Sequence, residues 1–328
     1  MKKSSKMLFL SLAMLSTMMV LNTTNWINMW IGMEINLMSF IPMMSKSNDK
    51  TSSQGMMMYF LIQSMASILF VTSCLTLKHI HQETNLSQII MMTSMMMKLG
   101  VPPFHQWFIE MINKSPWNIM MFLMSWQKLA PMHVTSNLIN KLSLTFMIAA
   151  TTTSSMFGIN QTSTRKIMAY SSVGHMGWIM ACAKTFKKSW ILYLMLYTLI
   201  VVMMCMMLKF YNIMHINQFT MSMKTPMEKL SFLTSMMSMG GLPPFLGFMP
   251  KWMAIQNMLW SKEMMILTLM ITSTIITLSY YLFMILPKMT TNNQSQKWTT
   301  KMKTSKTLSM NLTLNILLPI SMSTINFS

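Results

Sequence analysis

The sequence is poor in charged residues, which make up 9% of its 328 residues, against about 25% in an average soluble domain. Apolar residues account for 52% of the chain and occur in runs long enough to span a bilayer. Side chains that water does not solvate must face lipid or one another. The composition therefore excludes a soluble globular domain and predicts an all-α polytopic membrane protein.

Cysteine is also scarce. The three cysteines lie in apolar runs and lack the spacing of metal ligands or of a disulfide framework. The sequence contains no Gly-rich nucleotide loop, no cysteine cluster for an iron–sulfur centre and no HExxH zinc motif. The 52 methionines are read as flexible substitutes for Leu and Ile rather than as a metal cluster. We therefore expect no cofactor and no metal in this chain.

Acidic residues number only 6 against 25 basic ones, which gives a formal net charge of +19. The basic residues are scattered through short loops, without a basic motif or a platform of aromatic residues, so we expect no nucleic-acid binding. Attraction to anionic phospholipids such as cardiolipin accounts for this charge.

The apolar runs predict about eleven transmembrane helices. Ten cover residues 1–22, 26–44, 56–77, 88–110, 116–138, 142–159, 167–183, 190–211, a ninth that ends near 260, and 264–286; the last covers about 308–326. The first run also resembles a signal peptide, but no small-residue cleavage site precedes the second, which favours a retained helix. We treat residues 1–328 as a single transmembrane domain with approximate repeats 1–141 and 142–287.

The loop charges predict an orientation. With loops numbered alternately, 16 of the 25 Lys and Arg residues fall on the side of the N-terminus and 6 on the other. Basic residues accumulate on the side that is not translocated. The N-terminus is therefore predicted inside, and an odd number of spans places the C-terminus outside.

A short string recurs inside two of the predicted spans. Gly100-Val-Pro-Pro-Phe104 is echoed by Gly241-Leu-Pro-Pro-Phe245. Consecutive prolines remove helix hydrogen bonds and free backbone carbonyls at membrane depth. Interrupted helices in corresponding positions of two halves indicate a transport site, with a merely structural kink as the alternative. The predicted breaks comprise Gly100, Pro102, Pro103, Gly241, Pro243 and Pro244.

Three lysines and one glutamate lie inside predicted spans, namely Lys98, Lys128, Lys251 and Glu34. Burial disfavours the charged form of a lysine and a neighbouring carboxylate favours it, so a lysine held between these influences can exchange a proton when its partner moves. Glu34 is the candidate partner of Lys98. The alternatives are a static ion pair or, mainly for Lys251, a side chain that reaches the membrane surface. We predict that all four residues belong to a proton pathway.

Histidines supply candidate relays between these lysines. His105, His133 and His175 lie in or at the ends of predicted spans. A lone histidine inside a membrane is usually a hydrogen-bonded packing residue, and a relay is the functional alternative. In the fifth span, Ser125, Lys128 and Thr135 would share one face of a continuous helix and are expected to point inward together.

Five strings carry a resemblance to a known family: WIGMEINLMSFIP (30–42), KLGVPPFHQW (98–107), SWQKLAP (125–131), AYSSVGHMGW (169–178) and GGLPPFLGFMPKW (240–252). In this order they resemble the subunit 2 family of mitochondrial NADH dehydrogenase, one of the antiporter-like membrane subunits of respiratory complex I. The resemblance implies inverted five-helix repeats with two broken helices, and eleven helices in the animal form. It also implies the mitochondrial inner membrane, with the N-terminus in the matrix and the C-terminus in the intermembrane space.

The resemblance implies a function as well. The chain would be a core subunit of proton-pumping NADH:ubiquinone oxidoreductase, with proton transfer at Glu34, Lys98, Lys128 and Lys251. FMN, iron–sulfur clusters and the NADH and quinone sites would belong to other subunits, and the partners would be membrane-arm subunits including further antiporter-like ones. Two alternatives stay open: a stand-alone cation/proton antiporter, against which the lack of a carboxylate cluster for sodium argues, and a passive scaffold subunit.

Overall fold

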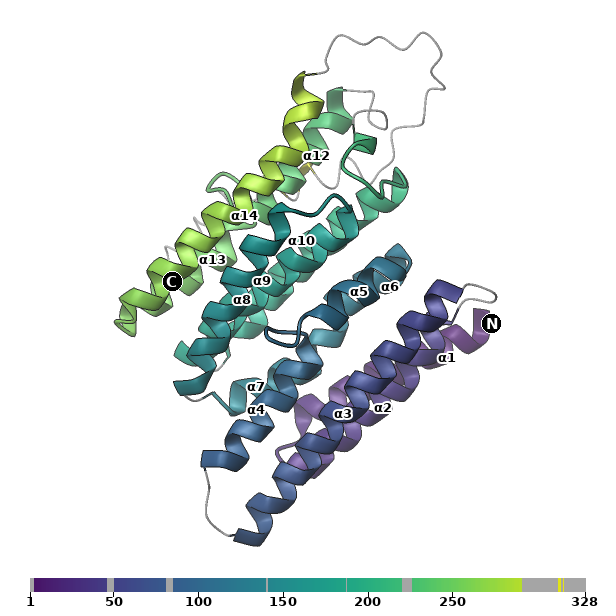
Figure 1. Ribbon diagram of the computed structural model, residues 1–328, viewed down its shortest axis with the longest axis vertical. Coiled ribbons are helices and arrows are strands. Elements are labelled where there is room, and N and C mark those ends of the chain that lie inside the picture. The colour runs from purple at the N-terminus through teal and green to yellow at the C-terminus, as the bar shows by residue number, and fades with distance from the viewer. Residues whose placement is uncertain are drawn as a thin grey trace. The chain divides into compact units, whose positions relative to one another are not determined.

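The computed structural model describes residues 3–45, 50–80, 85–139, 141–186, 188–219 and 226–290, together with residues 312, 313 and 315. These parts are helical, joined by short connections, with one isolated antiparallel bridge between Ser163 and His215. The chain divides into two compact units, Met1–Ala150 and Thr151–Ser328 (Figure 1). The predicted helix at 308–326 lies outside the described residues except at the three positions named above.

The first unit is built around α2, which contacts α1, α3 and α7, while α3 also contacts α4 and α5. Its helices are α1 (Lys3–Asn22), α2 (Trp26–Met44), α3 (Lys50–Ile80), α4 (Asn85–Leu99), α5 (Gln106–Lys114), α6 (Trp117–Met124), the 3₁₀ helix η1 (Trp126–Lys128), α7 (Leu129–Asn137) and the first part of α8 (Lys141–Ile159).

The second unit is built around α9 (Thr164–Thr185), in which every residue from Ile167 to Ala183 is buried. The other helices are the end of α8, α10 (Ser189–Phe210), α12 (Pro226–Gly240), α13 (Phe248–Trp260) and α14 (Met264–Thr290). α9 contacts α10 and α13, and α12 contacts α10 and α14. Small residues on α9 allow close approach: a Cβ at Gly174 would lie 2.6 Å from Ser154 Oγ.

Four of the described helices are long and apolar enough to cross a membrane, namely Ser4–Asn22, Lys50–Leu77, Ser189–Phe210 and Met264–Leu286. Three more of the predicted spans are interrupted, so that none of their pieces α4, α5, α6, α7, α12 and α13 exceeds 15 residues. Helices nevertheless occur within each of the first ten predicted spans, and α2 has the predicted bounds.

The first predicted break follows Leu99. Gly100 has a φ of 68°, in the left-handed region that glycine adopts without a steric penalty. The N–H of Gly100 donates to the carbonyl of Met97, and the N–H of Val101 donates to that of Met96. These two bonds form a Schellman motif, which closes the end of a helix.

The second break repeats this geometry after Gly240. Gly241 has a φ of 76°. The N–H of Gly241 donates to the carbonyl of Ser238, and the N–H of Leu242 donates to that of Met237. The predicted interruption of helical hydrogen bonding at Gly100–Pro103 and Gly241–Pro244 is thus confirmed.

A third interruption lies in the predicted fifth span, where a continuous helix was expected. α6 and α7 are separated by Ser125 and by the 3₁₀ turn that ends at Lys128. Pro131 accounts for this break, because it has no N–H to donate to the carbonyl of Gln127 and its ring crowds that carbonyl. The expectation of one continuous helical face is therefore wrong, although Lys128 and Thr135 are both buried.

Candidate functional site

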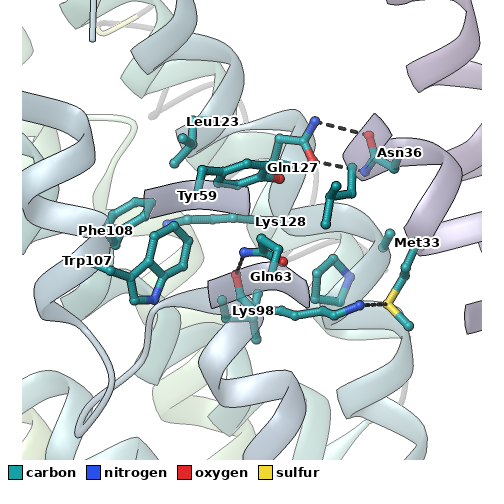
Figure 2. Close-up of a pocket in the computed structure, with 14 residues that line it drawn as sticks. Met33, Asn36, Tyr59, Gln63, Lys98, Trp107, Phe108, Leu123, Gln127 and Lys128 are labelled. Atoms are coloured by element: carbon teal, nitrogen blue, oxygen red, sulfur yellow. Dashed lines mark hydrogen bonds between the residues drawn. The ribbon is translucent and has the colours of Figure 1, made fainter. Parts of the chain in front are cut away.

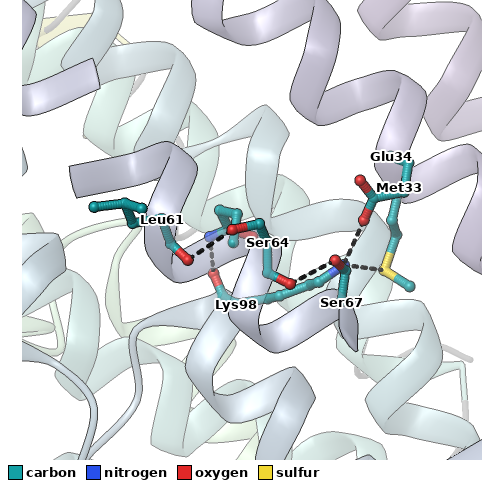
Figure 3. A network of polar contacts seen from close by, with 7 residues as sticks. Met33, Glu34, Leu61, Ser64, Ser67 and Lys98 are labelled. Atoms are coloured by element: carbon teal, nitrogen blue, oxygen red, sulfur yellow. Dashed lines mark hydrogen bonds and ion pairs between the residues drawn. The ribbon is translucent and has the colours of Figure 1, made fainter. Parts of the chain in front are cut away.

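Lys98 and Glu34 are brought together by α4 and α2. Lys98 Nζ lies 4.0 Å from Glu34 Oε1 and 3.9 Å from the sulfur of Met33 (Figure 3). The lysine side chain is 3% exposed and that of the glutamate 26%. The predicted proximity of these two residues is therefore confirmed. At this separation a small shift of either helix decides whether ammonium and carboxylate are in direct contact.

The break beside Lys98 is stabilised by a residue that the sequence did not single out. Because α4 ends at Leu99, the carbonyl of Lys98 has no helical donor. Gln63 on α3 donates from Nε2 to this carbonyl at 3.1 Å. A glutamine within an apolar run was the only signal in the sequence, and the partner lies 35 residues away.

Lys128 is held in the 3₁₀ turn between α6 and α7 and is 3% exposed. Its Nζ lies 5.4 Å from the centre of the Phe108 ring on α5, within the range of a cation–π interaction. Phe108 in turn packs against the break, since a Cβ at Gly100 would lie 2.7 Å from Phe108 Cβ. The first break and the position of Lys128 are thus linked through one aromatic ring.

The two lysines of the first unit line one cavity (Figure 2). The volume open to the centres of water molecules is about 30 Å³, room for roughly two waters. The lining residues that carry polar groups are Asn36, Tyr59, Gln63, Lys98, Trp107, Gln127 and Lys128. Lys98 and Lys128 therefore face one space that is large enough for water.

Lys251 lies on α13 and is 7% exposed. Its side chain folds back across the second break, where Nζ donates to the carbonyl of Gly240 at 2.8 Å. Gly241 leaves space for it, because a Cβ there would lie 2.8 to 3.0 Å from the Cδ, Cε and Nζ atoms of Lys251. A cation at the carbonyl end of a helix is stabilised by the helix dipole. Lys251 thus caps α12 and is buried, which argues against the alternative that its side chain reaches the membrane surface.

A second cavity, within the second unit, brings Lys251 and His175 together. Its volume open to the centres of water molecules is about 20 Å³, room for roughly one water. The lining is rich in hydroxyl groups, from Thr151, Ser154, Ser171, Ser273, Thr274, Thr277, Tyr280 and Tyr281. His175 and Lys251 therefore face the same hydroxyl-lined space.

The ring of His175 is oriented by α10. Its Nδ1 lies 3.1 Å from the hydroxyl of Tyr193, and the Tyr197 ring centre is 4.9 Å from its own. A hydroxyl can donate or accept, so this contact serves both neutral tautomers of the imidazole. A carboxylate in that place would favour only one of them. The arrangement suits a residue that takes up and releases a proton.

His105 and His133 are placed differently. His105 occupies the N-cap position of α5, His133 lies on α7, and both are half-buried. Neither is among the residues that line the two cavities described above. Of the three predicted relays, His175 lines a cavity together with a buried lysine, Lys251.

An ion pair that was not predicted joins Lys184, in the last turn of α9, to Glu263, in the connection before α14. Both side chains are about one-fifth exposed, at 23% and 22%. The contact ties α9 to the connection between α14 and α13, the helix that carries Lys251. Lys184 and Glu263 are 79 residues apart, so no local pattern in the sequence indicates that they pair.

Comparison with known proteins identifies relatives over almost the whole chain. The family described as NADH:quinone oxidoreductase/Mrp antiporter, transmembrane, matches residues 23–277. NADH-ubiquinone oxidoreductase chain 2 of Locusta migratoria is 36% identical over 310 residues, 92% of this chain and 91% of the relative. The protein of the same name from Ovis aries is 33% identical over 333 residues, 94% of each chain.

Solved structures share the fold. A chain of respiratory complex I from Thermus thermophilus with bound aureothin superimposes with a TM-score of 0.83 at 18% identity, covering 96% of this chain and 77% of that one. A chain of the Mrp complex from Dietzia sp. DQ12-45-1b gives a TM-score of 0.75 at 15% identity, covering 84% and 59%.

Proposed function

Because this chain belongs to the NADH:quinone oxidoreductase/Mrp antiporter transmembrane family, we propose that its two lysine-lined cavities are parts of a proton pathway. The chain is a membrane subunit of respiratory complex I, the proton-translocating NADH:ubiquinone oxidoreductase. The proposal concerns which of its residues carry the proton.

The observation that carries the proposal is the pair of buried lysines on one cavity. Lys98 lies beside Glu34, and Lys128 faces the same water-sized space. A buried charge is expensive without a partner, so ionisable groups in a membrane domain that face a wet interior mark a pathway. A proton that leaves Lys98 loses the attraction of Glu34 and passes through water to Lys128.

In the second unit the pathway consists of Lys251 and His175. Lys251 donates a hydrogen bond to the end of α12 while it is protonated. When it gives up the proton, the water and hydroxyl groups of the second cavity connect it to His175. His105 and His133 are lesser candidates, because they do not line these cavities.

The energy for proton movement reaches this chain from elsewhere in the complex. We propose that NADH oxidation and quinone reduction take place in other subunits, which hold the FMN and the iron–sulfur clusters. This chain then has no redox active site, NADH site or quinone site of its own. Its partners are the other subunits of the membrane arm, including further antiporter-like subunits, and phospholipids such as cardiolipin.

The proposed topology has eleven transmembrane helices and inverted five-helix repeats at about 1–141 and 142–287. We place the chain in the mitochondrial inner membrane, with the N-terminus in the matrix and the C-terminus in the intermembrane space. The excess of Lys and Arg in loops on the side of the N-terminus supports this orientation.

A second candidate function is exchange of a cation for protons by the chain alone. The similarity of its fold to that of a chain of the Mrp complex favours it. Purified chain in vesicles would then acidify or alkalinise the lumen when a sodium gradient is imposed. We favour the complex I subunit, because this chain covers about nine-tenths of the length of relatives named NADH-ubiquinone oxidoreductase chain 2.

Replacement of Lys128 by Met tests the proton pathway, since it keeps the length of the side chain and removes the titrating group. We expect assembled complex and NADH binding to be retained and NADH–quinone turnover to fall about tenfold or more, because a blocked proton step restrains the coupled redox step. Lys209→Met, at an exposed position on α10, is the control.

Turnover and proton pumping are measured together in vesicles. Normal values of both for Lys128→Met would reject the pathway and favour the scaffold role. Normal turnover with reduced pumping would leave the pathway standing, with looser coupling between the proton and redox steps.

A further inference from the structure

Two carboxamide side chains form a reciprocal pair at the first cavity (Figure 2). Asn36 Nδ2 donates to Gln127 Oε1 at 2.9 Å, and Gln127 Nε2 donates to Asn36 Oδ1 at 3.1 Å. Two parallel bonds between planar groups resist rotation as well as separation. Neither group titrates, so the pair holds its geometry whatever the charge on the lysines around it.

Asn36 belongs to the turn of α2 that also contacts Lys98. Met33 and Glu34 approach the ammonium group of Lys98, and Asn36 follows within one helical turn of 3.6 residues. Any displacement of this turn caused by a change at the Glu34–Lys98 pair therefore moves the carboxamide of Asn36 as well.

Gln127 directly precedes Lys128 in a junction where the backbone provides few restraints. The N–H of Lys128 bonds to the carbonyl of Ser125 at a long 3.4 Å. The carbonyl of Gln127 receives no bond from position 131, which is a proline. Side chains therefore contribute to the position of the 3₁₀ turn, and the carboxamide pair is a polar connection from it to α2.

We propose that the Asn36–Gln127 pair is a positioning element that fixes Lys128 relative to the Glu34–Lys98 pair and transmits movement of α2 between the two lysines. The inference rests on the proposed function and adds the mechanical connection between its first two steps. Loss of the proton from Lys98 releases Glu34, the turn of α2 shifts, and the carboxamide pair carries this shift to the turn that holds Lys128.

Three variants of the assembled complex test this role: Asn36→Leu, Gln127→Met and the two combined. Each replacement keeps the approximate size of the side chain and removes the amide. A single replacement leaves the other amide partly buried without its partner, whereas the double replacement removes both. We therefore expect the temperature of half-inactivation to fall in each single variant and to return close to the wild-type value in the double variant.

Turnover separates positioning from mere packing. We expect NADH–quinone turnover and the pumping coupled to it to fall about tenfold in each single variant and about equally in the double variant, because all three lack the same connection. The exchanged variant Asn36→Gln/Gln127→Asn keeps the total length of the pair and should recover turnover to within about threefold of wild type.

Gln63→Met provides a matched control, since Gln63 is an amide on the same cavity that bonds to a backbone carbonyl instead. Gln63→Met and Asn36→Leu should act independently, so that their fold-reductions in turnover multiply when the two substitutions are combined. Two results for the double variant Asn36→Leu/Gln127→Met would overturn the positioning role. One is wild-type turnover, and the other is a fold-reduction equal to the product of those of the two single variants. If Lys128→Met also turns over and pumps normally, the proposed function falls together with it; if Lys128→Met is impaired, only the positioning role falls.

Discussion

Replacing Gly241 by alanine should displace Lys251 from its position in the second cavity, because this glycine meets two requirements at once. Its φ of 76° lies in a region that alanine adopts only with strain. Its missing side chain also makes room for Lys251, whose Cδ, Cε and Nζ atoms would lie 2.8 to 3.0 Å from an added Cβ. The lysine side chain is the flexible partner in this contact, so it is the group that moves.

The magnitude follows from these two effects. The left-handed conformation costs an alanine about 1–2 kcal/mol relative to glycine. Moving Lys251 breaks the 2.8 Å bond to the Gly240 carbonyl, and a hydrogen bond from a charged group is worth about 1.5–3 kcal/mol. Gly241→Ala should therefore weaken the break and its lysine cap by roughly 2.5–5 kcal/mol in all. That is enough to shift Lys251 out of its capping position in most molecules.

The assay is proton pumping and NADH–quinone turnover by the assembled complex in vesicles, with the amount of complex measured in parallel. We expect assembly to be reduced modestly and pumping per complex to fall strongly. Gly241→Asn separates the two causes, because asparagine tolerates the left-handed region better but carries the same Cβ. Gly55→Ala is the neutral control, since the nearest atom to its Cβ is 3.8 Å away. Normal pumping per complex in Gly241→Ala would refute the argument.

Two other substitutions give contrasting outcomes. Glu34→Gln should reduce coupled pumping while the complex assembles in normal amount, because the amide has nearly the same shape as the carboxylate but does not titrate. If pumping is normal, the Glu34–Lys98 pair has no part in transfer. Gly247→Ala should instead abolish assembly, because its Cβ would lie 1.6 Å from the backbone carbonyl oxygen of Ser238, which no side-chain rotation relieves; a normal amount of complex on a native gel would contradict this.

The sequence predicted the parts of the site that follow from local chemistry. A glycine followed by two prolines stops a helix wherever it occurs, and both breaks adopt the same Schellman geometry. Lysines in apolar runs are buried in the structure, at 7% exposure or less for Lys98, Lys128 and Lys251. The proximity of Glu34 and Lys98 was also predictable, because a carboxylate in an apolar span needs a partner and few others are available.

The parts that were missed depend on packing between distant segments. The Asn36–Gln127 pair joins residues 91 positions apart, and neither side chain alone indicates its partner. The interruption at Ser125 did have a local signal in Pro131, but a single proline is also compatible with a kinked continuous helix. The placement of His175 beside Lys251 results from the contact of α9 with α13, which periodicity does not predict.

The two buried lysines next to the Gly-x-Pro-Pro breaks are stabilised by different means, and this difference has a mechanical consequence. Lys98 precedes its break and faces a carboxylate, so loss of its proton removes an attraction between α4 and α2. Lys251 follows its break and donates to the last carbonyl of α12, so loss of its proton weakens the end of that half-helix. In the proposed pathway, a proton transfer in the first unit would therefore act on the packing of two helices, through one turn of α2. In the second unit it would act on the break itself, because the side chain of Lys251 lies directly against Gly241.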